Sequence, residues 1–346
     1  MDYAKLLRYY IAEAEQAKAS DIHLKPGRLG IIRTNGALNA VGTRVLSNED
    51  IIAMADLILN DVQRQTLETE KDVDFSFSLD GKKRCRCNAY QDMHGLSLAI
   101  RRYSDEKKDF KQLGIPEVLK ELSMKKSGFI LITGPTGSGK TTTLATVLDY
   151  INTHRSGHII TIEDPIEFVF DSEQCLVTQR EINNDTPSFA AALKAVLRQD
   201  PDIIVLGEMR DLESIGTALT AAETGHLVLA TMHTTGAVNA VDRIIDSFPS
   251  DQQNQVRMQL SMVLTCVVSQ QLIPSSNSHN GRVLATEVMV GNAAVRSLIR
   301  QNRLHMIQNT MLTSGPQGMY TLNQSLESLY KRGLISSSDY KMYVAE

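Results

Sequence analysis

A glycine-rich segment at residues 134–141 constrains the fold of this chain more than any other feature. It has the sequence GPTGSGKT and lies between the apolar run 129–132 and a helical stretch at 142–148. Strand, glycine-rich loop and helix in that order form the context in which G-x-x-x-x-G-K-[ST] builds a phosphate-binding loop. Its glycines let backbone N–H groups converge on an anion, and the helix N-terminus adds partial positive charge. A turn that binds nothing would need neither Lys140 nor Thr141, so the segment predicts binding of a nucleoside triphosphate.

The polar positions of this loop have expected roles. Lys140 is expected to reach the β- and γ-phosphates, and the Thr141 hydroxyl is expected to ligate Mg²⁺. We therefore expect a nucleoside triphosphate and Mg²⁺ as cofactors. The nucleotide-binding residues predicted from this segment are Gly134, Thr136, Gly137, Ser138, Gly139, Lys140, Thr141 and Thr142.

Side chains at the ends of three further apolar runs have the chemistry that hydrolysis requires. That step needs an activated water and a fixed metal ion, and the ligands of open α/β sheets sit at the carboxyl ends of the strands. The runs typical of buried parallel strands are 158–162, 203–206 and 227–232. The side chains at their ends are Glu163 after the first, Glu208 after the second, and His226 and His233 on either side of the third.

Each of these side chains also has a plainer interpretation. A carboxylate after a strand is often only a helix N-cap, and a single histidine at a strand end is more often a hydrogen-bonded structural residue. The run before Glu208 also departs from the usual pattern, in which an Asp faces the metal. Because all three runs surround one phosphate loop, we expect Glu163 to polarise the attacking water. Glu208 is then expected to hold Mg²⁺ or its water shell, together with Thr141.

The bulk composition narrows the classes of protein that fit. A length of 346 residues indicates two domains, since single cores rarely grow past about 250–300 residues. The net charge of −4 argues against a basic footprint for nucleic acid, so we expect no nucleic-acid partner. None of the four cysteines forms a C-x-x-C pair, which argues against a zinc site. Neither a membrane span of about 20 apolar residues nor a signal-peptide core is visible, so we expect a cytoplasmic protein.

The pattern along the chain predicts two domains of different class. Residues 1–102 mix short strand and helix patterns, with a capping box at 47–50, and predict an α+β domain. A charged segment within 103–111 is expected to be the linker. Residues 112–346 alternate buried strand runs with helices and predict an α/β domain with a C-terminal helical region. The helices expected in that region include 256–272 and 293–307.

Four segments resemble the boxes of secretion ATPases in sequence, order and spacing. These boxes, known as the Walker A, Asp box, Walker B and His box, match residues 134–141, 161–168, 197–211 and 224–234. Within that superfamily, the chain resembles the retraction ATPases of type IV pili, the PilT family. The segments that carry this resemblance elsewhere in the chain are 19–24, 74–77, 84–89, 294–300 and 318–322.

The resemblance implies a fold, a reaction and partners. The fold would be a RecA-like P-loop ATPase domain with C-terminal helices, preceded by a smaller PAS-like α+β domain. The reaction would be Mg²⁺-dependent hydrolysis of ATP by a homohexamer, which powers pilus retraction and twitching motility. The ring would act on an inner-membrane pilus platform protein, at the inner face of the cytoplasmic membrane. It would associate with that membrane only through its partners.

The resemblance also implies further residues of the nucleotide site. At least one of His226 and His233 would contact the nucleotide or report its γ-phosphate, with a structural role as the alternative for His226. Arginines from the N-terminal domain, namely Arg84, Arg86 and Arg101, would complete the site at a domain or subunit junction. Arg84 and Arg86 are two residues apart on one strand and so share a face. The plainer interpretation of the three arginines is a solvated sheet face.

The helix expected at 294–300 lies far in sequence from every nucleotide box. In the family that the chain resembles, this motif is needed for retraction and is less tied to hydrolysis. Replacing Arg296 and Leu298 is therefore expected to separate the two. From spacing alone, an ordinary amphipathic helix with solvated arginines would be the simpler interpretation.

Three other functions stay open at this point. Pilus extension ATPases and type II secretion ATPases share the four boxes, but the extension enzymes carry a further N-terminal domain and typically a four-cysteine zinc site. The sequence shows neither, which favours retraction. A nucleic-acid translocase is disfavoured by the missing basic face. A non-hydrolysing regulatory homologue is disfavoured by the intact Glu163 and Glu208.

Overall fold

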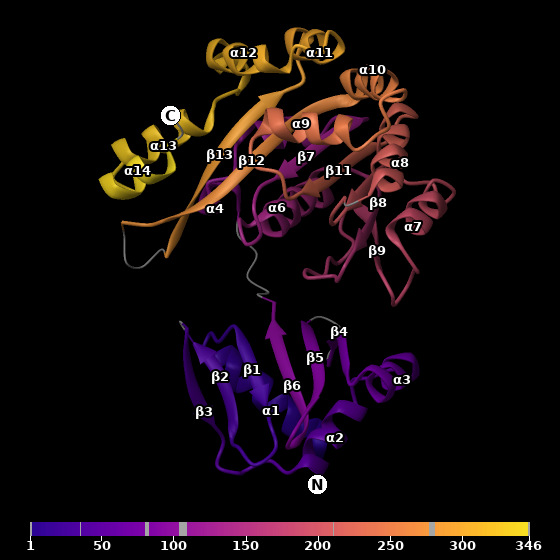
Figure 1. Ribbon diagram of the computed structural model, residues 1–346, viewed down its shortest axis with the longest axis vertical. Coiled ribbons are helices and arrows are strands. Elements are labelled where there is room, and N and C mark those ends of the chain that lie inside the picture. The colour runs from indigo at the N-terminus through magenta and orange to yellow at the C-terminus, as the bar shows by residue number, and fades with distance from the viewer. Residues whose placement is uncertain are drawn as a thin grey trace. The chain divides into compact units, whose positions relative to one another are not determined.

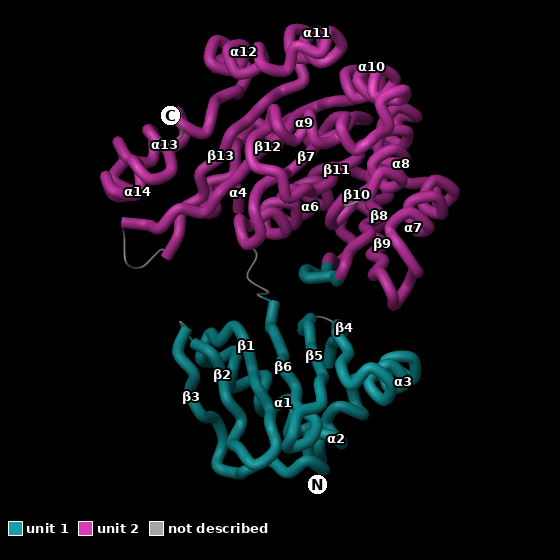
Figure 2. Tube along the Cα trace, in the orientation of Figure 1, with its two compact units in different colours: residues 1–106, 165–169 teal, residues 107–164, 170–346 magenta. Residues whose placement is uncertain are grey.

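The computed structural model describes residues 2–34, 36–79, 83–103, 109–209, 211–276 and 281–344. Contacts between residues divide the chain into two units (Figure 2). The first unit comprises residues 1–106 and 165–169, and the second comprises residues 107–164 and 170–346. Most of the linker predicted at 103–111 lies outside the described residues, as does Arg210 of the predicted Walker B segment.

The first unit contains a six-stranded sheet in the order β3-β2-β1-β6-β5-β4, in which every neighbouring pair is antiparallel (Figure 1). Its elements are α1 (Tyr3–Gln16), β1 (Asp21–Leu24), β2 (Gly30–Thr34), β3 (Ala37–Val41), α2 (Asn48–Asp56), α3 (Asp61–Glu70), β4 (Asp72–Ser78), β5 (Arg84–Asp92) and β6 (Gly95–Arg102). Strand β3 follows β2 directly and was not predicted from the sequence.

Alternating side chains give this sheet one buried and one polar face. Phe75 and Phe77 of β4 are buried, and so are Cys85 and Cys87 of β5, whereas the residues between them are more exposed. Helix α2 begins at the predicted capping box. There, the Asp50 N–H donates to Ser47 Oγ over 3.2 Å and the Ser47 N–H donates to Asp50 Oδ2 over 2.9 Å, so that prediction is confirmed.

The second unit contains a seven-stranded sheet in the order β13-β12-β7-β11-β10-β8-β9. All neighbours are parallel except β12 and β13. Its elements up to the sixth parallel strand are α4 (Phe110–Leu113), α5 (Val118–Ser123), β7 (Gly128–Thr133), α6 (Lys140–His154), β8 (Gly157–Glu163), β9 (Cys175–Glu181), α7 (Phe189–Val196), β10 (Ile203–Leu206), α8 (Leu212–Glu223), β11 (Leu227–Met232), α9 (Ala237–Asp246), α10 (Gln253–Val263) and β12 (Leu264–Pro274). The remaining elements are β13 (Arg282–Val290), α11 (Ala293–Arg300), the 3₁₀ helix η1 (Leu304–Met306), α12 (Ile307–Thr313), the 3₁₀ helix η2 (Gly315–Gln317), α13 (Leu322–Lys331) and α14 (Ser337–Tyr343).

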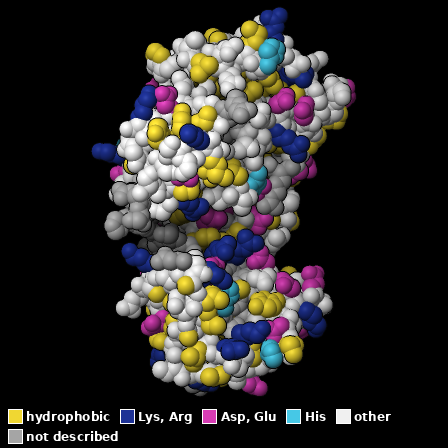
Figure 3. All heavy atoms as spheres, turned by 60° about the vertical axis from the view of Figure 1, so that its left-hand side comes forward, with side chains coloured by type: hydrophobic (Ala, Val, Ile, Leu, Met, Phe, Trp, Pro, Cys, Tyr) yellow, Lys and Arg dark blue, Asp and Glu magenta, His cyan; other side chains and the backbone are white. Residues whose placement is uncertain are grey.

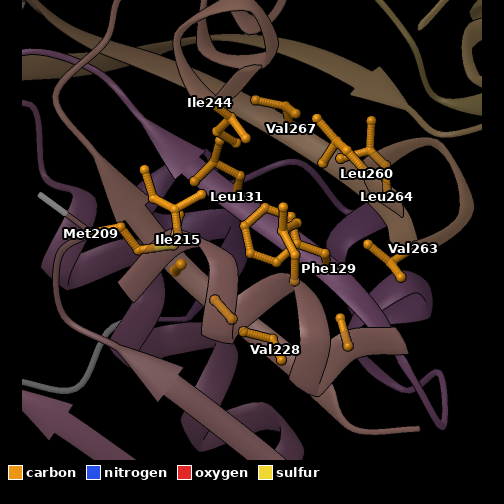
Figure 4. Close-up of a cluster of buried hydrophobic side chains, with 14 of the residues drawn as sticks. Phe129, Leu131, Met209, Ile215, Val228, Ile244, Leu260, Val263, Leu264 and Val267 are labelled. Atoms are coloured by element: carbon orange, nitrogen blue, oxygen red, sulfur yellow. The ribbon is translucent and has the colours of Figure 1, made fainter. Parts of the chain in front are cut away.

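Helices cover both faces of this sheet, and strand β7 is buried on both. Phe129 and Leu131 belong to a cluster with Ile215 of α8 and Ile244 of α9 (Figure 4). Ile130 and Ile132, which alternate with them, belong to the opposite cluster with residues of α5 and α6. Because six strands run parallel, their carboxyl ends lie at one edge of the sheet, where the residues predicted to bind nucleotide are concentrated.

The helix predicted for residues 256–272 is wrong beyond Val263. Helix α10 ends there, and Leu264–Pro274 forms β12, which pairs with both β7 and β13. Four of its residues, Thr265, Val267, Val268 and Ile273, have β-branched side chains that suit a strand, and pairing with two neighbours satisfies its backbone. The helix predicted for 293–307 is also shorter than expected, since α11 ends at Arg300.

Among the described residues, no helix combines the length and the apolar composition that crossing a membrane requires.

Candidate active site

The predicted phosphate loop joins β7 to α6 and packs closely against β12. Gly134 has a φ of 146°, and a Cβ on it would lie 2.3 Å from the Gln270 carbonyl oxygen. Gly139, with a φ of 87°, is the left-handed residue from which α6 begins. Both positions therefore require glycine, one for space and both for backbone conformation. The loop that results lies at the carboxyl edge of the parallel strands.

Lys140 is the first residue of α6, and its side chain folds back over the loop. Its Nζ donates to the carbonyl oxygens of Gly134 at 2.8 Å and Pro135 at 3.0 Å. The residue is only 8% exposed. Burial lowers the pKa of the Lys140 ammonium, and the negative charge of Glu208 opposes that shift. A desolvated cation at the mouth of an anion-binding loop is suited to pairing with a phosphate.

His233 joins the phosphate loop to Glu208. Its Nε2 lies 2.9 Å from Glu208 Oε1, while its Nδ1 lies 3.4 Å from Lys140 Nζ and 3.3 Å from Thr136 Oγ1. A neutral imidazole with its proton on Nε2 satisfies these contacts, because it donates to the carboxylate and accepts at Nδ1. The structure thus brings together Thr136, Lys140, Glu208 and His233, which the sequence placed in the site. They come from the loop after β7, the start of α6 and the segments that follow β10 and β11.

Glu163 is the last residue of β8, the strand next to β10. Its Oε1 accepts hydrogen bonds from Thr161 Oγ1 at 2.6 Å and from Gln179 Nε2 at 3.1 Å. A Cβ on Gly207, in the segment after β10, would lie 3.3 Å from the Glu163 Cα, so glycine lets the two strand ends approach. These contacts orient the carboxylate, and neither Thr161 nor Gln179 was identified as a site residue from the sequence.

Of the other predicted loop residues, Ser138 is buried, and Thr141 and Thr142 lie half-buried in the first turn of α6. The sequence pattern does not point to Gln270 of β12, because it predicts a helix for that segment. It is fully buried, and its Nε2 donates to the Ser138 carbonyl oxygen at 2.7 Å. Ser138 Oγ and Gln270 Oε1 are buried and have no hydrogen-bond partner in the described part of the chain. These two atoms on the buried side of the phosphate loop can therefore still form hydrogen bonds.

His226 lies at the other edge of the sheet. It precedes β11, and in the register of β11 with β7 the start of β11 is opposite Gly128, whereas its end is opposite Thr133 beside the phosphate loop. The His226 Nδ1 lies 2.8 Å from the Ala221 carbonyl oxygen near the end of α8. The structure does not bring this histidine to the phosphate loop, and its position favours the structural alternative.

The two histidines should therefore behave differently when each is replaced by Ala. His226→Ala is expected to lower stability by about 1 kcal/mol, the value of one hydrogen bond, with normal specific ATPase activity. His233→Ala is expected to lower kcat about tenfold or more, because Glu208 and Lys140 lose their shared partner. Melting temperature and ATPase rate of the purified variants check both. The opposite pattern, activity lost with His226 and kept without His233, would contradict the assignment.

The three predicted arginines lie on the polar face of the first unit's sheet. Arg86 of β5 is directly opposite Arg101 of β6 in the strand register, and Arg84 lies two residues before Arg86 on β5. Each has a partner on that face. Arg86 pairs with Asp74, Arg84 donates to Ser76, and Arg101 Nε lies 2.9 Å from Asp21 Oδ1. Arg101 is largely exposed. Their contribution to the nucleotide site stays a prediction.

Comparison with known proteins identifies the group to which the chain is similar. A family model described as type II/IV secretion system protein matches residues 2–337. The type IV pilus retraction ATPase PilT of Pseudomonas aeruginosa is 45% identical over 336 residues, which cover 97% of this chain and 96% of that one. A twitching motility protein of Neisseria gonorrhoeae is 45% identical over 306 residues, or 88% of this chain and 82% of that one.

The crystal structure of the pilus retraction motor PilT with bound ADP matches with a TM-score of 0.90 at 45% identity, covering 97% and 96% of the two chains. The expected α/β fold class is thereby confirmed.

Proposed function

This chain belongs to the family of type II/IV secretion system proteins, and from that premise we propose that it is an ATP-hydrolysing motor that retracts type IV pili. It is similar over almost its whole length to a pilus retraction ATPase, and over most of it to a twitching motility protein. The observation that carries the proposal is the meeting of Lys140, His233 and Glu208 at one edge of the sheet. Glu163 ends the strand next to the one that precedes Glu208.

ATP is the substrate, and each residue of the site has a separate role in its hydrolysis. Lys140 neutralises charge on the β- and γ-phosphates once its ammonium exchanges loop carbonyls for phosphate oxygens. Glu163, held by Thr161 and Gln179, orients a water molecule and accepts its proton. His233 touches both Lys140 and Glu208, so it is placed to respond when a γ-phosphate changes the partners of either.

Mg²⁺ fits the donors that the site offers. The Thr141 hydroxyl and the Glu208 carboxylate are hard oxygen ligands, which this ion prefers. Among the described residues, no group of three His, Cys, Asp or Glu side chains is arranged to hold a metal ion. We therefore propose that Thr141 and Glu208 hold the ion together with nucleotide oxygens. The ion would supply charge stabilisation of the transferring phosphoryl group.

We further propose that the motor is a homohexamer at the inner face of the cytoplasmic membrane, where it acts on an inner-membrane pilus platform protein. The support is the resemblance to pilus retraction ATPases. Light scattering of the purified protein with Mg²⁺ and a non-hydrolysable ATP analogue is expected to give the mass of six chains. A single-chain mass across the micromolar range would contradict the ring.

We propose that helix α11 passes the movement driven by ATP hydrolysis on to the pilus machinery. Arg296 and Leu298, the two residues of this helix chosen for replacement from the sequence, differ in their surroundings. Arg296 is partly buried, and it donates from Nε to the Gly291 carbonyl oxygen at 2.7 Å and from a terminal nitrogen to that of Leu264 at 3.0 Å. Replacing it is expected to lower stability by about 2 kcal/mol, because two backbone acceptors lose a charged donor. Leu298 packs partly against the core. Arg300 is exposed and offers a cleaner test.

We expect Arg300→Glu to leave the ATPase rate within about twofold of wild type, since surface substitutions away from the site perturb folding little. The same variant is expected to stop pilus retraction in cells. The measurements are ATP hydrolysis by the purified protein and twitching by a strain that carries the variant gene. Loss of hydrolysis in parallel with retraction would mean that the helix only supports the fold.

The nucleic-acid translocase alternative makes a different biochemical prediction. On the face shown in Figure 3, Lys and Arg side chains of each unit lie among Asp and Glu side chains and form no continuous basic band within either unit. A translocase would bind DNA through such a band. The test of the proposed function is therefore Mg²⁺-dependent ATP hydrolysis by the purified chain with and without DNA. Hydrolysis indifferent to DNA is expected, and strong stimulation by DNA would favour the translocase.

A further inference from the structure

One level of the second unit's sheet carries three polar side chains in a row across three strands. Thr133 ends β7, Ser269 of β12 is its partner in the strand register, and Glu287 of β13 is the partner of Ser269. Thr133 and Ser269 are buried and Glu287 is partly buried. Since Thr133 is the last residue before the phosphate loop, the row begins at the nucleotide site.

This row holds the backbone of residues 233–237, which lead from His233 to the start of α9. The Thr133 hydroxyl donates to the Thr234 carbonyl oxygen. The next two hydrogen bonds come from consecutive N–H groups, from Gly236 to Ser269 Oγ at 2.9 Å and from Ala237 to Glu287 Oε1 at 2.6 Å. Strands β7, β12 and β13 thus hold three consecutive peptide groups. Because His233 directly precedes these groups, its position depends on the row.

Glu287 takes the place of a missing helix cap. Gly236, the N-cap residue of α9, has no side chain with which to accept the orphan N–H groups of the first turn. The Glu287 carboxylate accepts one of them from outside the helix. Negative charge at a helix N-terminus also interacts favourably with the helix dipole. Helix α9 and the segment before it therefore rely on a residue of β13.

The second oxygen of the same carboxylate reaches a different helix. Glu287 Oε2 accepts from the Leu322 N–H at 3.3 Å, at the start of α13. The neighbours of Glu287 on β13 also hold this region. The Thr286 N–H donates to Ser325 Oγ at 3.1 Å, and the Val288 N–H donates to the Tyr320 carbonyl oxygen at 2.9 Å. A movement of Glu287 would therefore change the hydrogen bonds that hold the start of α13.

We propose that Glu287 is a positioning residue that sets the place of the His233 segment and couples it to α13. The two helix N-termini share one carboxylate, so a shift of residues 233–237 changes the support of α13. That shift would follow when a phosphate replaces His233 as a neighbour of Lys140, now at 3.4 Å. The inference rests on the proposed function, because it takes the phosphate loop to bind ATP.

Hydrogen exchange of the full-length protein tests this coupling. The wild type and variants are compared without nucleotide and with Mg²⁺ and a non-hydrolysable ATP analogue. In the wild type, exchange is expected to change with nucleotide both in residues 233–240 and in residues 322–331. In Glu287→Gln the change at 322–331 is expected to fall to less than about a fifth. The two helix N–H groups meet different oxygens of Glu287, and in a carboxamide one of these is replaced by an NH₂ group that donates and cannot accept.

Thr321→Ala is the matched control. Thr321 Oγ accepts from the Gln324 N–H at 3.4 Å, so this substitution loosens α13 at its own cap and leaves Glu287 in place. Residues 322–325 are expected to exchange about fivefold faster in both states, but to keep their response to nucleotide. A response lost as fully in Thr321→Ala as in Glu287→Gln would overturn the proposal, since general loosening of α13 would then suffice.

Other outcomes are equally decisive. A Glu287→Gln variant with a wild-type response at 322–331 overturns the coupling. If that variant does not fold, Glu287→Asp applies the same test, because its shorter carboxylate is expected to reach only one helix at a time. A wild-type chain that binds the analogue and responds only at 233–240 refutes the coupling and leaves the proposed function intact. A wild-type chain that binds no analogue refutes the proposed function itself.

Discussion

Replacing Lys140 with Ala is expected to abolish ATP hydrolysis, with a fall in rate of about 10³-fold or more, because the loop loses its cation at the β- and γ-phosphates. In the structure the Lys140 ammonium lies over the loop, bound to the Gly134 and Pro135 carbonyl oxygens and 3.4 Å from His233 Nδ1. The steady-state rate of phosphate release from Mg²⁺ and ATP measures the effect.

The control for this substitution is Lys194→Ala. Lys194 lies in the same unit, its side chain is 60% exposed, and its ion pair with Glu213 is on the surface. Surface ion pairs contribute about 0–1 kcal/mol, so neither stability nor rate should change much. Melting temperatures of both variants separate lost catalysis from lost folding. A folded Lys140→Ala protein with wild-type turnover would contradict the phosphate-loop assignment.

Glu163→Gln is expected to keep nucleotide binding and to lose hydrolysis by about 10²–10⁴-fold, the range for removal of a general base. The substitution preserves shape and leaves an acceptor oxygen for Thr161 and Gln179, so the local hydrogen bonds can persist. The effect should therefore appear in kcat, with little change in the dissociation constant of ATP.

Glu208→Gln provides the comparison for Glu163→Gln. Glu208 contacts His233 and is the proposed ligand of Mg²⁺, so its substitution should raise the Mg²⁺ concentration required for activity. Titrating Mg²⁺ at saturating ATP distinguishes the two carboxylates. If Glu163→Gln turns over normally while Glu208→Gln does not, the assignment of base and metal ligand is reversed.

The sequence predicts the parts of this site that local pattern determines. The phosphate loop is a continuous motif with its own strand and helix, so its residues and its place at a sheet edge follow from residues 129–148. The capping box of Ser47 and Asp50 is likewise a local signal, and both of its hydrogen bonds form. Glu208 and His233 could be grouped because each follows a run that reads as a parallel strand.

Pairing between distant segments was beyond the sequence patterns. The run that forms β12 was assigned to a helix, because an apolar segment of that length has no period that separates the two states. Pairing with β7 and β13 makes this segment a strand. Without knowledge of that pairing, Ser269 and Gln270 could not be placed behind the phosphate loop. Gln179 was missed for the same reason, since it reaches Glu163 from β9, which pairs with β8.

Spacing alone also failed to distinguish similar residues in different settings. His226 and His233 flank the same strand, yet only His233 lies at the edge that carries the phosphate loop. Arg296 and Arg300 are four residues apart on one helix, yet Arg296 binds two backbone carbonyl oxygens and Arg300 is exposed. Direction along a strand, and what lies beside a helix, depend on tertiary packing.

The most direct test of the account is to delete the gene in its own host and to count surface pili while measuring twitching. We predict excess pili together with lost twitching, because pili would still be extended but no longer withdrawn. The wild-type gene should restore both properties, and the Glu163→Gln gene should restore neither. Cells without pili after the deletion would contradict a retraction motor and identify the chain as an extension ATPase.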